Sequence, residues 1–466
     1  QDLNFGFSRP FLAPGADMTA AIVLFLFVLQ DHASGGGGGL CPDDSWHASG
    51  YLRSGPGVDY FYYLAESRSE RPSGDPLVLW MTGGPGCAST LALLLENGPC
   101  HVSGDGASVT RNPWSWTQVA NMLWVDQPIG VGYSTPGTHL DADKHDVASN
   151  MLVFLKSFYA EFPRYLRIPL FIVGESYGGH YVPAVASRLL NARGVASLAG
   201  VAIGNGLVDP QIQFASKPAM AYTGGAGGSL GGGVVDNMTF ERMEASLPSC
   251  EEGIRACQTT GAPTCQLALQ NCIISQIFPV QATGKNPYDL RRVCVNSPVQ
   301  PPGVCYDLGP QTKLLNSPAV KKALGVPAAL RWTACNMTVS SKFAASGDYL
   351  ADYRRQVVTL LGAKVKVLVY AGDTDFMVDW LGCRAWVAQL PWKHQIDWLA
   401  APNRPFMLRN KSRGMVQSAF GLTFMQVYDS GHMVPMDQPE VSLAMLADFL
   451  ASPGAELGVR DQSRQA

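Results

Sequence analysis

The sequence predicts an α/β fold in which a mostly parallel central sheet carries helices on both faces. Two observations support this: short apolar segments alternate with stretches of helical periodicity, and several apolar segments run into a glycine-containing turn. Hydrophobic residues make up 47% of the 466 residues, which is enough for a sizeable core. The net charge is only −3 and no basic stripe is present, so nucleic acid is not an expected partner.

The predicted elements alternate along most of the chain. We expect strands at 76–81, 121–125, 169–173, 198–203, 364–370 and 424–428, and helices at 145–162, 182–191 and 439–450. Residues 216–310 break this alternation and contain six of the eleven cysteines, so they predict a disulfide-stapled insertion domain that covers the site as a lid. The core is then divided into 41–215 and 311–453, flanked by a leader-like or non-native segment at 1–40 and a polar tail at 454–466.

Several features point to the secretory pathway, with a vacuolar, lysosomal or extracellular destination. Eleven cysteines are many for a cytosolic enzyme, and Asn237, Asn336 and Asn410 each begin an N-glycosylation triplet. The apolar run 20–29 fits the core of a signal peptide that begins at Met18, with part of a propeptide as the alternative. This run is too short to cross a membrane, and no other segment is long and apolar enough.

The cysteines favour disulfides over a metal site. No pair has the zinc-type C-x-x-C spacing, and the run Cys250, Cys257, Cys265 and Cys272 has gaps of six, seven and six residues. That spacing fits two nested bridges, and we expect neither a metal ion nor an organic cofactor.

A candidate nucleophile follows the third predicted strand. Gly174-Glu-Ser-Tyr-Gly178 matches G-x-S-x-G between an apolar strand and a helical stretch, which is the context of a nucleophile elbow. The two glycines allow a sharp turn, so we expect the Ser176 hydroxyl to be exposed at the strand end. The alternative is an ordinary serine in a tight turn.

A serine becomes nucleophilic when a base, itself held by an acid, takes its proton. After such an elbow the chain order is Ser, then Asp or Glu, then His. His432 follows the sixth predicted strand and a glycine, which makes it the best candidate base. Asp373 and Asp375 both follow the fifth strand; we prefer Asp375 as the acid, with Asp373 left to cap the turn.

An oxyanion hole requires two backbone N–H groups that point at one position. We expect one from Tyr177, the residue after the nucleophile, and one from the Gly83-Gly84 turn after the first strand. A phosphate-binding loop is the competing interpretation of that turn, but no Gly-Lys-Ser/Thr follows it.

These motifs resemble those of the serine carboxypeptidases, most closely the carboxypeptidase Y-like branch, over about residues 50–450. The resemblance rests on Leu79-Trp-Met-Thr-Gly-Gly-Pro-Gly-Cys87, Gly174-Glu-Ser-Tyr-Gly-Gly-His-Tyr-Val-Pro183 and Gly431-His-Met-Val-Pro435. Further support comes from Val125-Asp-Gln-Pro-Ile-Gly130, Gly204-Asn-Gly206, Asn286-Pro-Tyr-Asp289 and Tyr370-Ala-Gly-Asp-Thr-Asp-Phe376. It implies the α/β-hydrolase fold and an exopeptidase that releases C-terminal amino acids from peptides and proteins through an acyl-enzyme.

The resemblance also implies roles for individual residues. It assigns the catalytic triad to Ser176, Asp375 and His432, and the oxyanion hole to the backbone of Gly84 and Tyr177. The substrate's terminal carboxylate would be bound by the hydrogen-bonded pair Glu175 and Glu96, together with Gly83 and Thr82. Two adjacent carboxyl groups do not both ionise easily, so they keep a proton that can be donated to the substrate. Peptide hydrolysis is therefore expected to favour acidic pH.

The pocket for the leaving residue is expected to be lined or supported by Met433, Leu95 and Trp80. Thr82 departs from the family pattern, because many members carry an asparagine there whose amide helps to bind the carboxylate. A threonine offers a hydroxyl but no amide donor.

Four disulfides are implied by the resemblance: Cys87–Cys335, Cys250–Cys272, Cys257–Cys265 and Cys294–Cys305. Cys41, Cys100 and Cys383 are left without an assigned partner. Cys383 follows the acid loop and is either a free thiol near the pocket or a buried small residue, of which we favour the second.

Two other functions are compatible with the motifs. An acyltransferase that uses ester donors would have the same triad and would differ only in the acceptor. A lumenal protein that protects partner enzymes through its lid would need no triad. The presence of both Glu175 and Glu96 favours the peptidase.

Overall fold

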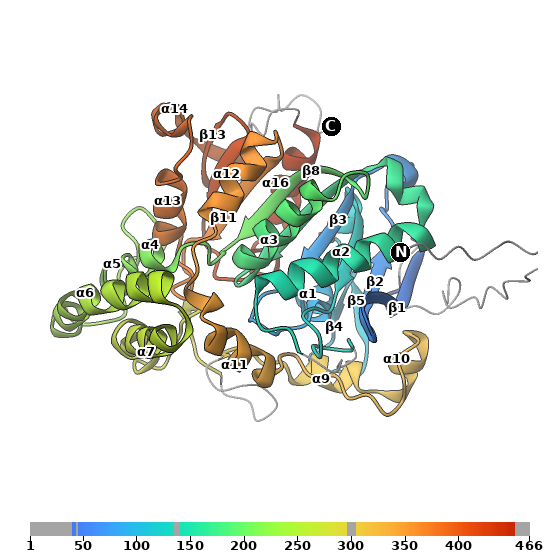
Figure 1. The fold of residues 1–466 in the computed structure, drawn as a ribbon, viewed down its shortest axis with the longest axis horizontal. Coiled ribbons are helices and arrows are strands. Elements are labelled where there is room, and N and C mark those ends of the chain that lie inside the picture. Colours follow the sequence, from blue (N-terminus) through green and yellow to red (C-terminus); the bar gives the residue numbers. More distant parts are fainter. Residues whose placement is uncertain (1–39, 43–44, 135–139, 296–303, 453–466) are drawn as a thin grey trace, which may run out of the picture. The chain divides into compact units, whose positions relative to one another are not determined.

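The computed structural model describes residues 40–42, 45–134, 140–295 and 304–452 (Figure 1). The predicted signal peptide at Met18 and the polar tail at 454–466 lie outside these residues. Within the described part, the prediction of an α/β fold with a mostly parallel central sheet is confirmed. Among the described helices, none combines the length and apolarity needed to cross a membrane.

The central sheet has ten strands in the order β1-β2-β6-β3-β7-β8-β11-β14-β13-β12. Their bounds are His47–Gly55 (β1), Val58–Ala65 (β2), Leu77–Met81 (β3), Asn121–Val125 (β6), Pro169–Glu175 (β7), Ser197–Gly204 (β8), Lys366–Gly372 (β11), Asn403–Leu408 (β12), Lys411–Ala419 (β13) and Leu422–Val427 (β14). The strands from β6 to β14 in this order pair in parallel, and the outer strands pair antiparallel. The parallel strands carry their functional loops at one common edge.

The six predicted strands are the six parallel strands, and the four antiparallel outer strands were missed. Strands that are buried on both faces form nearly continuous apolar runs, as in the fully buried β3 and β14. An outer strand such as β13 mixes exposed positions, Lys411 and Ser412, with buried ones, Val416 and Gln417. Since β13 has no continuous apolar run, a search for apolar runs identifies the central strands of the sheet but not its outer strands.

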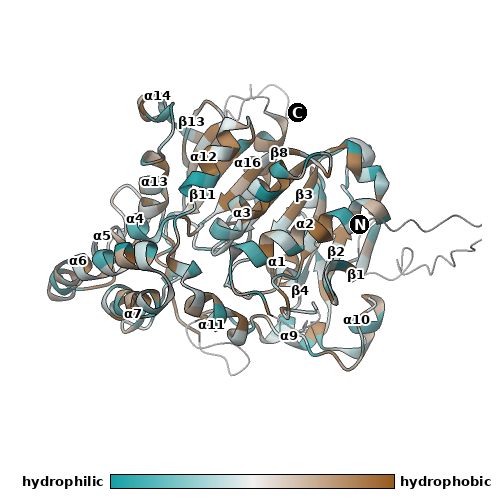
Figure 2. Cartoon of the chain, viewed as in Figure 1, coloured by the Kyte–Doolittle hydropathy of each residue, from teal (hydrophilic) through white to brown (hydrophobic). Residues whose placement is uncertain are grey.

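Helices cover both faces of the sheet. Strand residues three apart point to opposite faces. Phe171 of β7 contacts Phe449 of helix α16 (Pro439–Ala451), with ring centroids 5.5 Å apart, whereas a side chain added at Gly174 would meet Val182 of helix α3 (Gly178–Asn191). Helices α3 and α16 therefore lie on opposite faces (Figure 1), and the hydrophobic residues concentrate along the central strands between them (Figure 2).

The described helices are Ser89–Leu95 (α1), Lys144–Glu161 (α2), Gly178–Asn191 (α3), Pro210–Phe214 (α4), Lys217–Thr223 (α5), Asn237–Thr260 (α6), Ala262–Cys272 (α7), Phe278–Gln281 (α8), Gly309–Leu315 (α9), Pro318–Ala323 (α10), Met337–Ser346 (α11), Arg354–Gly362 (α12), Trp380–Ala388 (α13), Gln395–Ala400 (α14), Val434–Asp437 (α15) and Pro439–Ala451 (α16). The three predicted helices correspond to α2, α3 and α16. Helix α3 begins four residues before the predicted start, since two glycines, a histidine and a tyrosine after the elbow are already helical.

The segment 216–310 adds no strand to the central sheet in its described residues. It contains α5 to α8 and a short two-stranded sheet of Lys285–Asn286 (β9) and Asp289–Val293 (β10). A second short sheet, outside this segment, pairs Cys100–Val102 (β4) with Val109–Arg111 (β5). Helices α6 and α7 form a hairpin that two disulfides close. The limits of the insertion stay a prediction.

Five disulfides are present. Four of them join the pairs that the family resemblance implies. The fifth joins Cys41 to Cys100, two residues for which the sequence suggested no partner. Cys383 has a free thiol that is fully buried, which agrees with its interpretation as a small core residue.

The bridge Cys87–Cys335 closes the longest of the five loops. Replacing both cysteines with serine is expected to lower the free energy of unfolding by about 5 kcal/mol, because the sequence separation of 248 residues strongly restricts the unfolded chain. Urea denaturation measures this change. The matched control is serine at Cys257 and Cys265, whose separation is only 8 residues and whose loss should cost about 2.5 kcal/mol. An equal or larger loss in the control would contradict the loop-length argument.

Candidate active site

Ser176 lies at a strained turn between β7 and α3. Its φ of 63° is in the left-handed region, which is unfavourable for a residue with a side chain. Its backbone N–H donates to the carbonyl of Gly204 over 3.0 Å. The flanking glycines are needed, since a Cβ at Gly174 would lie 2.7 Å, and one at Gly178 3.1 Å, from the carbonyl oxygen of Met81. The elbow predicted from the sequence is thus present, and Ser176 is half-buried at the strand end.

His432 and Asp375 come from the loops after two neighbouring parallel strands, β14 and β11. Nδ1 of His432 lies 2.7 Å from Oδ2 of Asp375, and both side chains are buried. The carboxylate also accepts hydrogen bonds from the Asn205 amide over 2.9 Å and from the backbone N–H of Met377 over 2.8 Å. With Nδ1 engaged by the acid, the ring presents Nε2 as its other nitrogen.

Asp373, the other candidate acid, has different partners. Its two carboxylate oxygens accept from the backbone N–H and the hydroxyl of Ser229, over 2.6 and 2.7 Å. Ser229 belongs to the glycine-rich run of the insertion. The two candidate aspartates therefore have different contacts. Asp375 contacts His432, whereas Asp373 binds Ser229 and so connects the insertion to the loop after β11.

The Gly83-Gly84 turn faces the backbone N–H of Tyr177 at very short range. A Cβ added to Gly83 would lie 2.3 Å from Tyr177 N and 2.9 Å from Cβ of Ser176. Gly84 has a φ of 114°, which residues with side chains rarely adopt. The Gly83 position is thus packed closely against the backbone of Glu175 and Tyr177, which leaves no room for a side chain and holds the turn beside the Tyr177 N–H.

Replacing Gly83 with alanine is expected to lower kcat by about 10²- to 10³-fold, because the added Cβ would clash with the backbone of Glu175 and Tyr177 and displace the Gly83-Gly84 turn from the Tyr177 N–H. Steady-state kinetics on a blocked dipeptide measure the loss. Gly74→Ala is the matched control, since a Cβ there meets nothing within 4 Å. Full activity of Gly83→Ala would contradict the need for this close approach in the reaction.

Glu96 and Glu175 form a buried pair of carboxyl groups. Glu96 follows α1 and is 1% exposed, and Glu175 ends β7 and is 2% exposed. The two side chains lie close enough to share a hydrogen bond, and burial is the main reason why both pKa values are raised above the ordinary glutamate range. No donor group among the described residues reaches either oxygen of Glu96 or Oε2 of Glu175. The two carboxyl groups can bond to each other only while one of them carries a proton, and the raised pKa values favour that protonated state.

Thr82 is oriented by its neighbours at the end of β3. Its Oγ1 accepts from the indole N–H of Trp80 over 2.9 Å, so the hydroxyl proton is free to be donated elsewhere. Trp80 itself is fully buried and packs edge-on against Trp116, so its link to the site is this hydrogen bond. Met433 is 8% exposed, and Leu95 is partly buried beside Glu96.

Some residues around the site were not predicted as site residues. Asn205, with a φ of 37°, joins Asp375 to the backbone N–H of Gly372. The carbonyl of Tyr288 accepts from the backbone N–H of His432 over 2.8 Å, and the two rings lie 5.0 Å apart. Asn205 and Tyr288 lie in segments that support the family resemblance in the sequence. The sequence therefore marked these segments but did not assign a role to either residue.

Tyr306 is a further residue without any sequence signal. Its ring lies 5.6 Å from that of Tyr288, and its hydroxyl is buried with no hydrogen-bond partner among the described residues. Burial raises its pKa, with added contributions from nearby Asp437, Asp375 and Glu175. An unpaired phenol beside the carboxyl pair is available to a bound ligand.

Other predicted features lie away from this site. The described residues contain no group of three or more His, Cys, Asp or Glu side chains that could hold a metal ion. Asn237 and Asn410 are exposed, whereas Asn336 is partly buried and its amide donates to the carbonyl of Gly130.

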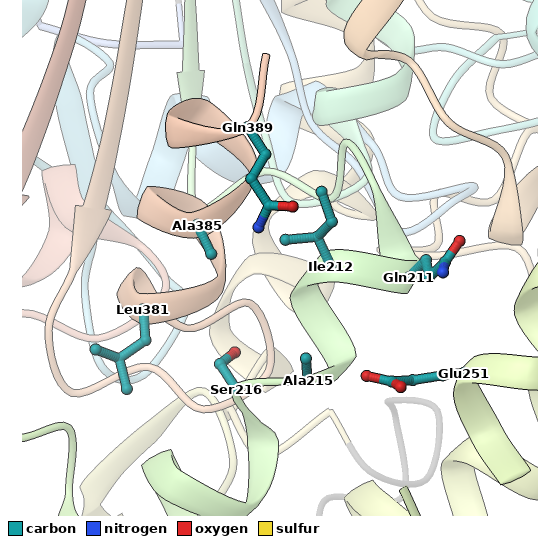
Figure 3. A pocket seen from close by; sticks show the side chains of 8 residues that line it. All are labelled: Gln211, Ile212, Ala215, Ser216, Glu251, Leu381, Ala385 and Gln389. Carbon is teal, nitrogen blue, oxygen red and sulfur yellow. The ribbon is translucent and has the colours of Figure 1, made fainter. Parts of the chain in front are cut away.

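A surface pocket of about 450 Å³ lies between α4, α6 and α13 and shares no residue with the site (Figure 3).

A serine at such an elbow, on a parallel sheet with a buried histidine–aspartate pair at the same edge, places the protein among the α/β-hydrolases. Comparison with known proteins narrows the class. A family model described as serine carboxypeptidase matches residues 41–452. The chain belongs to the serine carboxypeptidase family and is a hydrolase of that type.

Individual relatives agree with this assignment. A serine carboxypeptidase-like protein of Oryza sativa subsp. japonica is 38% identical over 425 residues, which cover 89% of this chain and 95% of that protein. Carboxypeptidase Y homolog A of Ajellomyces dermatitidis is 39% identical over 412 residues, which cover 86% and 73%. The crystal structure of Kex1Δp, a prohormone-processing carboxypeptidase of Saccharomyces cerevisiae, has the same fold, with a TM-score of 0.76 at 24% identity over 89% of this chain and 93% of that one.

Proposed function

We propose that the protein releases C-terminal amino acids through an acyl-enzyme formed on Ser176. His432 takes the hydroxyl proton as Ser176 Oγ attacks the last peptide carbonyl, and then gives it to the departing amino group. Water repeats the sequence, so that the shortened peptide leaves with a new carboxylate and Ser176 regains its proton. The 2.7 Å contact between His432 and Asp375 supports these roles, since it holds the imidazole ready to receive the proton.

The negative charge that develops on the carbonyl oxygen would be bound by the backbone N–H groups of Gly84 and Tyr177. The close packing of Gly83 against the Tyr177 backbone supports this assignment, because it holds the turn that carries the Gly84 N–H beside the Tyr177 N–H. Preorganised donors there stabilise the oxyanion more than the ground-state carbonyl, which is what accelerates the chemical step.

Preference for a free C-terminus would come from the carboxyl pair. A protonated Glu175–Glu96 pair can donate a hydrogen bond to the substrate carboxylate, whereas the fully ionised pair would repel it. Thr82, with its hydroxyl proton unused, and the backbone of Gly83 would add donors. The burial of two adjacent carboxyl groups, with no other donor among the described residues, is the observation that carries the proposal, and their raised pKa values lead us to propose an acidic pH optimum.

The insertion would form one wall of the site. The backbone N–H groups of Phe376 and Met377, next to the acid, donate to the carbonyl of Pro287, and the His432 N–H donates to Tyr288. These bonds hold the insertion against both catalytic loops. The disulfides and the exposed triplets at Asn237 and Asn410 support a location in the secretory pathway.

The test compares an N-blocked dipeptide that has a free C-terminus with its C-terminal amide, and follows release of the last residue. We expect faster release from the free acid at acidic pH. Ester donors with alcohol or amine acceptors form a second arm. Acyl transfer without hydrolysis of the free acid would contradict the peptidase and favour the acyltransferase.

A further inference from the structure

The side chain of Tyr177 is anchored by one polar contact. Its hydroxyl donates to Oδ2 of Asp348 over 3.0 Å, across 171 residues of sequence. The ring packs against the aromatic rings of Tyr181, Phe343 and Tyr349, with centroids 5.2 to 5.7 Å away, and only 2% of the residue is exposed. The ring therefore has little freedom to rotate, and the hydrogen bond to Asp348 fixes the position of its hydroxyl end.

Asp348 is itself a buried junction. The residue is 6% exposed, and its carboxylate also accepts from the hydroxyl of Tyr353 over 2.9 Å. The ring of His180 stacks on Tyr353 at 4.2 Å, and its Nδ1 lies 3.8 Å from the carboxylate. A buried carboxylate is stable only where donors surround it, and here the donors include the residue after the nucleophile.

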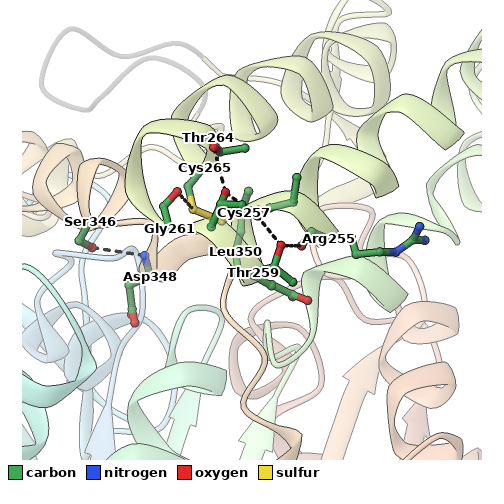
Figure 4. The surroundings of a disulfide bond; sticks show 12 residues. Arg255, Cys257, Thr259, Gly261, Thr264, Cys265, Ser346, Asp348 and Leu350 are labelled. Atoms are coloured by element: carbon green, nitrogen blue, oxygen red, sulfur yellow. Dashed lines mark hydrogen bonds between the residues drawn. A yellow bond between two sulfur atoms is a disulfide. The ribbon is translucent and has the colours of Figure 1, made fainter.

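The insertion fixes the backbone around Asp348 from the other side. Asp348 begins the single 3₁₀ turn Asp348–Leu350, which contacts α6 and α7. Gln258 of α6 donates its amide to the carbonyl of Leu350 over 2.9 Å. The turn lies beside the end of the hairpin that Cys257–Cys265 closes (Figure 4).

Tyr177 needs such an anchor because of the conformation of its neighbour. Ser176 has a φ of 63°, and a residue in that region stays there only where its surroundings hold it. The peptide unit between Ser176 and Tyr177 carries the N–H that faces the Gly83 turn. A small rotation of this unit would turn the N–H away from the oxyanion position without changing the fold.

We propose that Asp348 is a positioning residue for the oxyanion hole: it holds the Tyr177 hydroxyl and thereby keeps the Tyr177 backbone N–H aimed at the reacting carbonyl. This inference rests on the proposed function, because it needs that N–H to act on the oxyanion. Asp348 touches no substrate and acts only through Tyr177.

A double-mutant cycle tests the link. Tyr177→Phe and Asp348→Asn should each lower kcat by about tenfold with KM changed less than about twofold, since the donor is misaimed but present. The two losses should not multiply: in the Tyr177→Phe background, Asp348→Asn should add less than about a threefold further loss. A purely structural role would lower the folded fraction and leave kcat per folded molecule unchanged.

A peptide aldehyde supplies a second readout. Its adduct with Ser176 places an oxygen in the oxyanion hole, so its affinity should fall in parallel with kcat, while affinity for the product amino acid stays unchanged. Tyr159→Phe is the matched control, because it also removes a buried phenol hydroxyl, one without a hydrogen-bond partner in the described part. It should leave kcat and aldehyde affinity as in the wild type.

Multiplicative losses in the cycle, or equal losses of aldehyde and product affinity, would overturn the inference. If Asp348→Asn does not fold, Tyr177→Phe alone decides: unchanged kcat and unchanged aldehyde affinity would overturn it, and a parallel loss would support it. A wild-type enzyme without Ser176-dependent turnover would overturn the proposed function and this inference with it, and the wild-type assay reveals that before any cycle is run.

Discussion

Replacing Ser176 with alanine is expected to lower kcat for release of a C-terminal residue by about 10⁶-fold. Without the hydroxyl no acyl-enzyme can form, and the His432–Asp375 pair has no proton to take. The three residues act as a unit, so loss of the nucleophile should be nearly as damaging as loss of all three. The residual rate would come from the oxyanion hole and from substrate binding.

The measurement is a single-turnover assay with a blocked dipeptide, which detects slow rates. Ser187→Ala is the control, since Ser187 lies in the same helix α3 and its hydroxyl has no hydrogen-bond partner within the described ranges. It should retain full activity. If Ser176→Ala keeps more than about 1% of the wild-type rate, far above the level expected for a lost nucleophile, then Ser176 is not the nucleophile.

Replacing both Glu96 and Glu175 with glutamine is expected to remove the pH dependence of free-acid recognition. In the wild type, burial raises the pKa of both groups, so the pair stays protonated above the usual glutamate range and loses its last proton only at higher pH. Glutamine keeps a donor at every pH. Relative to the amide, the kcat/KM for the free acid should therefore fall as pH rises in the wild type, by up to tenfold for each pH unit above the raised pKa because one proton is lost, and stay nearly level in the double variant.

The same pair affects stability, with a defined sign. The folded protein holds protons that the unfolded chain releases near the ordinary glutamate pKa, so stability is greatest at acidic pH and declines as pH rises through the raised values. The double variant should show a flatter melting temperature between pH 4 and 8.

Asp141→Asn separates these two effects. Asp141 is another buried carboxylate, and burial raises its pKa to about 6. Its carboxylate accepts from Tyr60, Asn150 and the backbone N–H of Ile129, none of which is a proposed catalytic or carboxylate-binding group. Its replacement should alter the pH dependence of stability and leave the preference for the free acid unchanged. A change of that preference in Asp141→Asn, or none in the glutamine pair, would contradict the assigned role.

The central strands and the elbow could be predicted because each has a signal within a short stretch of sequence. Strands that are buried on both faces consist of apolar runs, and the elbow is a five-residue pattern that directly follows one of them. The outer strands could not be found this way, since β13 derives its place from pairing with β14, and β12 from pairing with β13, rather than from their own composition.

The site was predictable to the same extent. Ser176 and His432 each lie in a motif at the end of a strand. Asp373 and Asp375 follow the same strand, and only the folded structure shows that Asp375 contacts His432 while Asp373 contacts Ser229. Tyr306 and Asp348 reach the site from distant parts of the chain with no local pattern around them. Their contacts are set by tertiary packing, which periodicity and motifs do not encode.

We propose that a shared proton on the Glu96–Glu175 pair selects peptides that have a free C-terminal carboxylate. The most direct test is the ratio of kcat/KM for a blocked dipeptide acid to that for its amide, measured for the wild-type protein from pH 4 to 8. We predict a ratio well above one at acidic pH that falls steadily as the pair loses its proton, because the amide is neutral and is not repelled. A ratio that stays constant across this range, or that rises with pH, would contradict the claim.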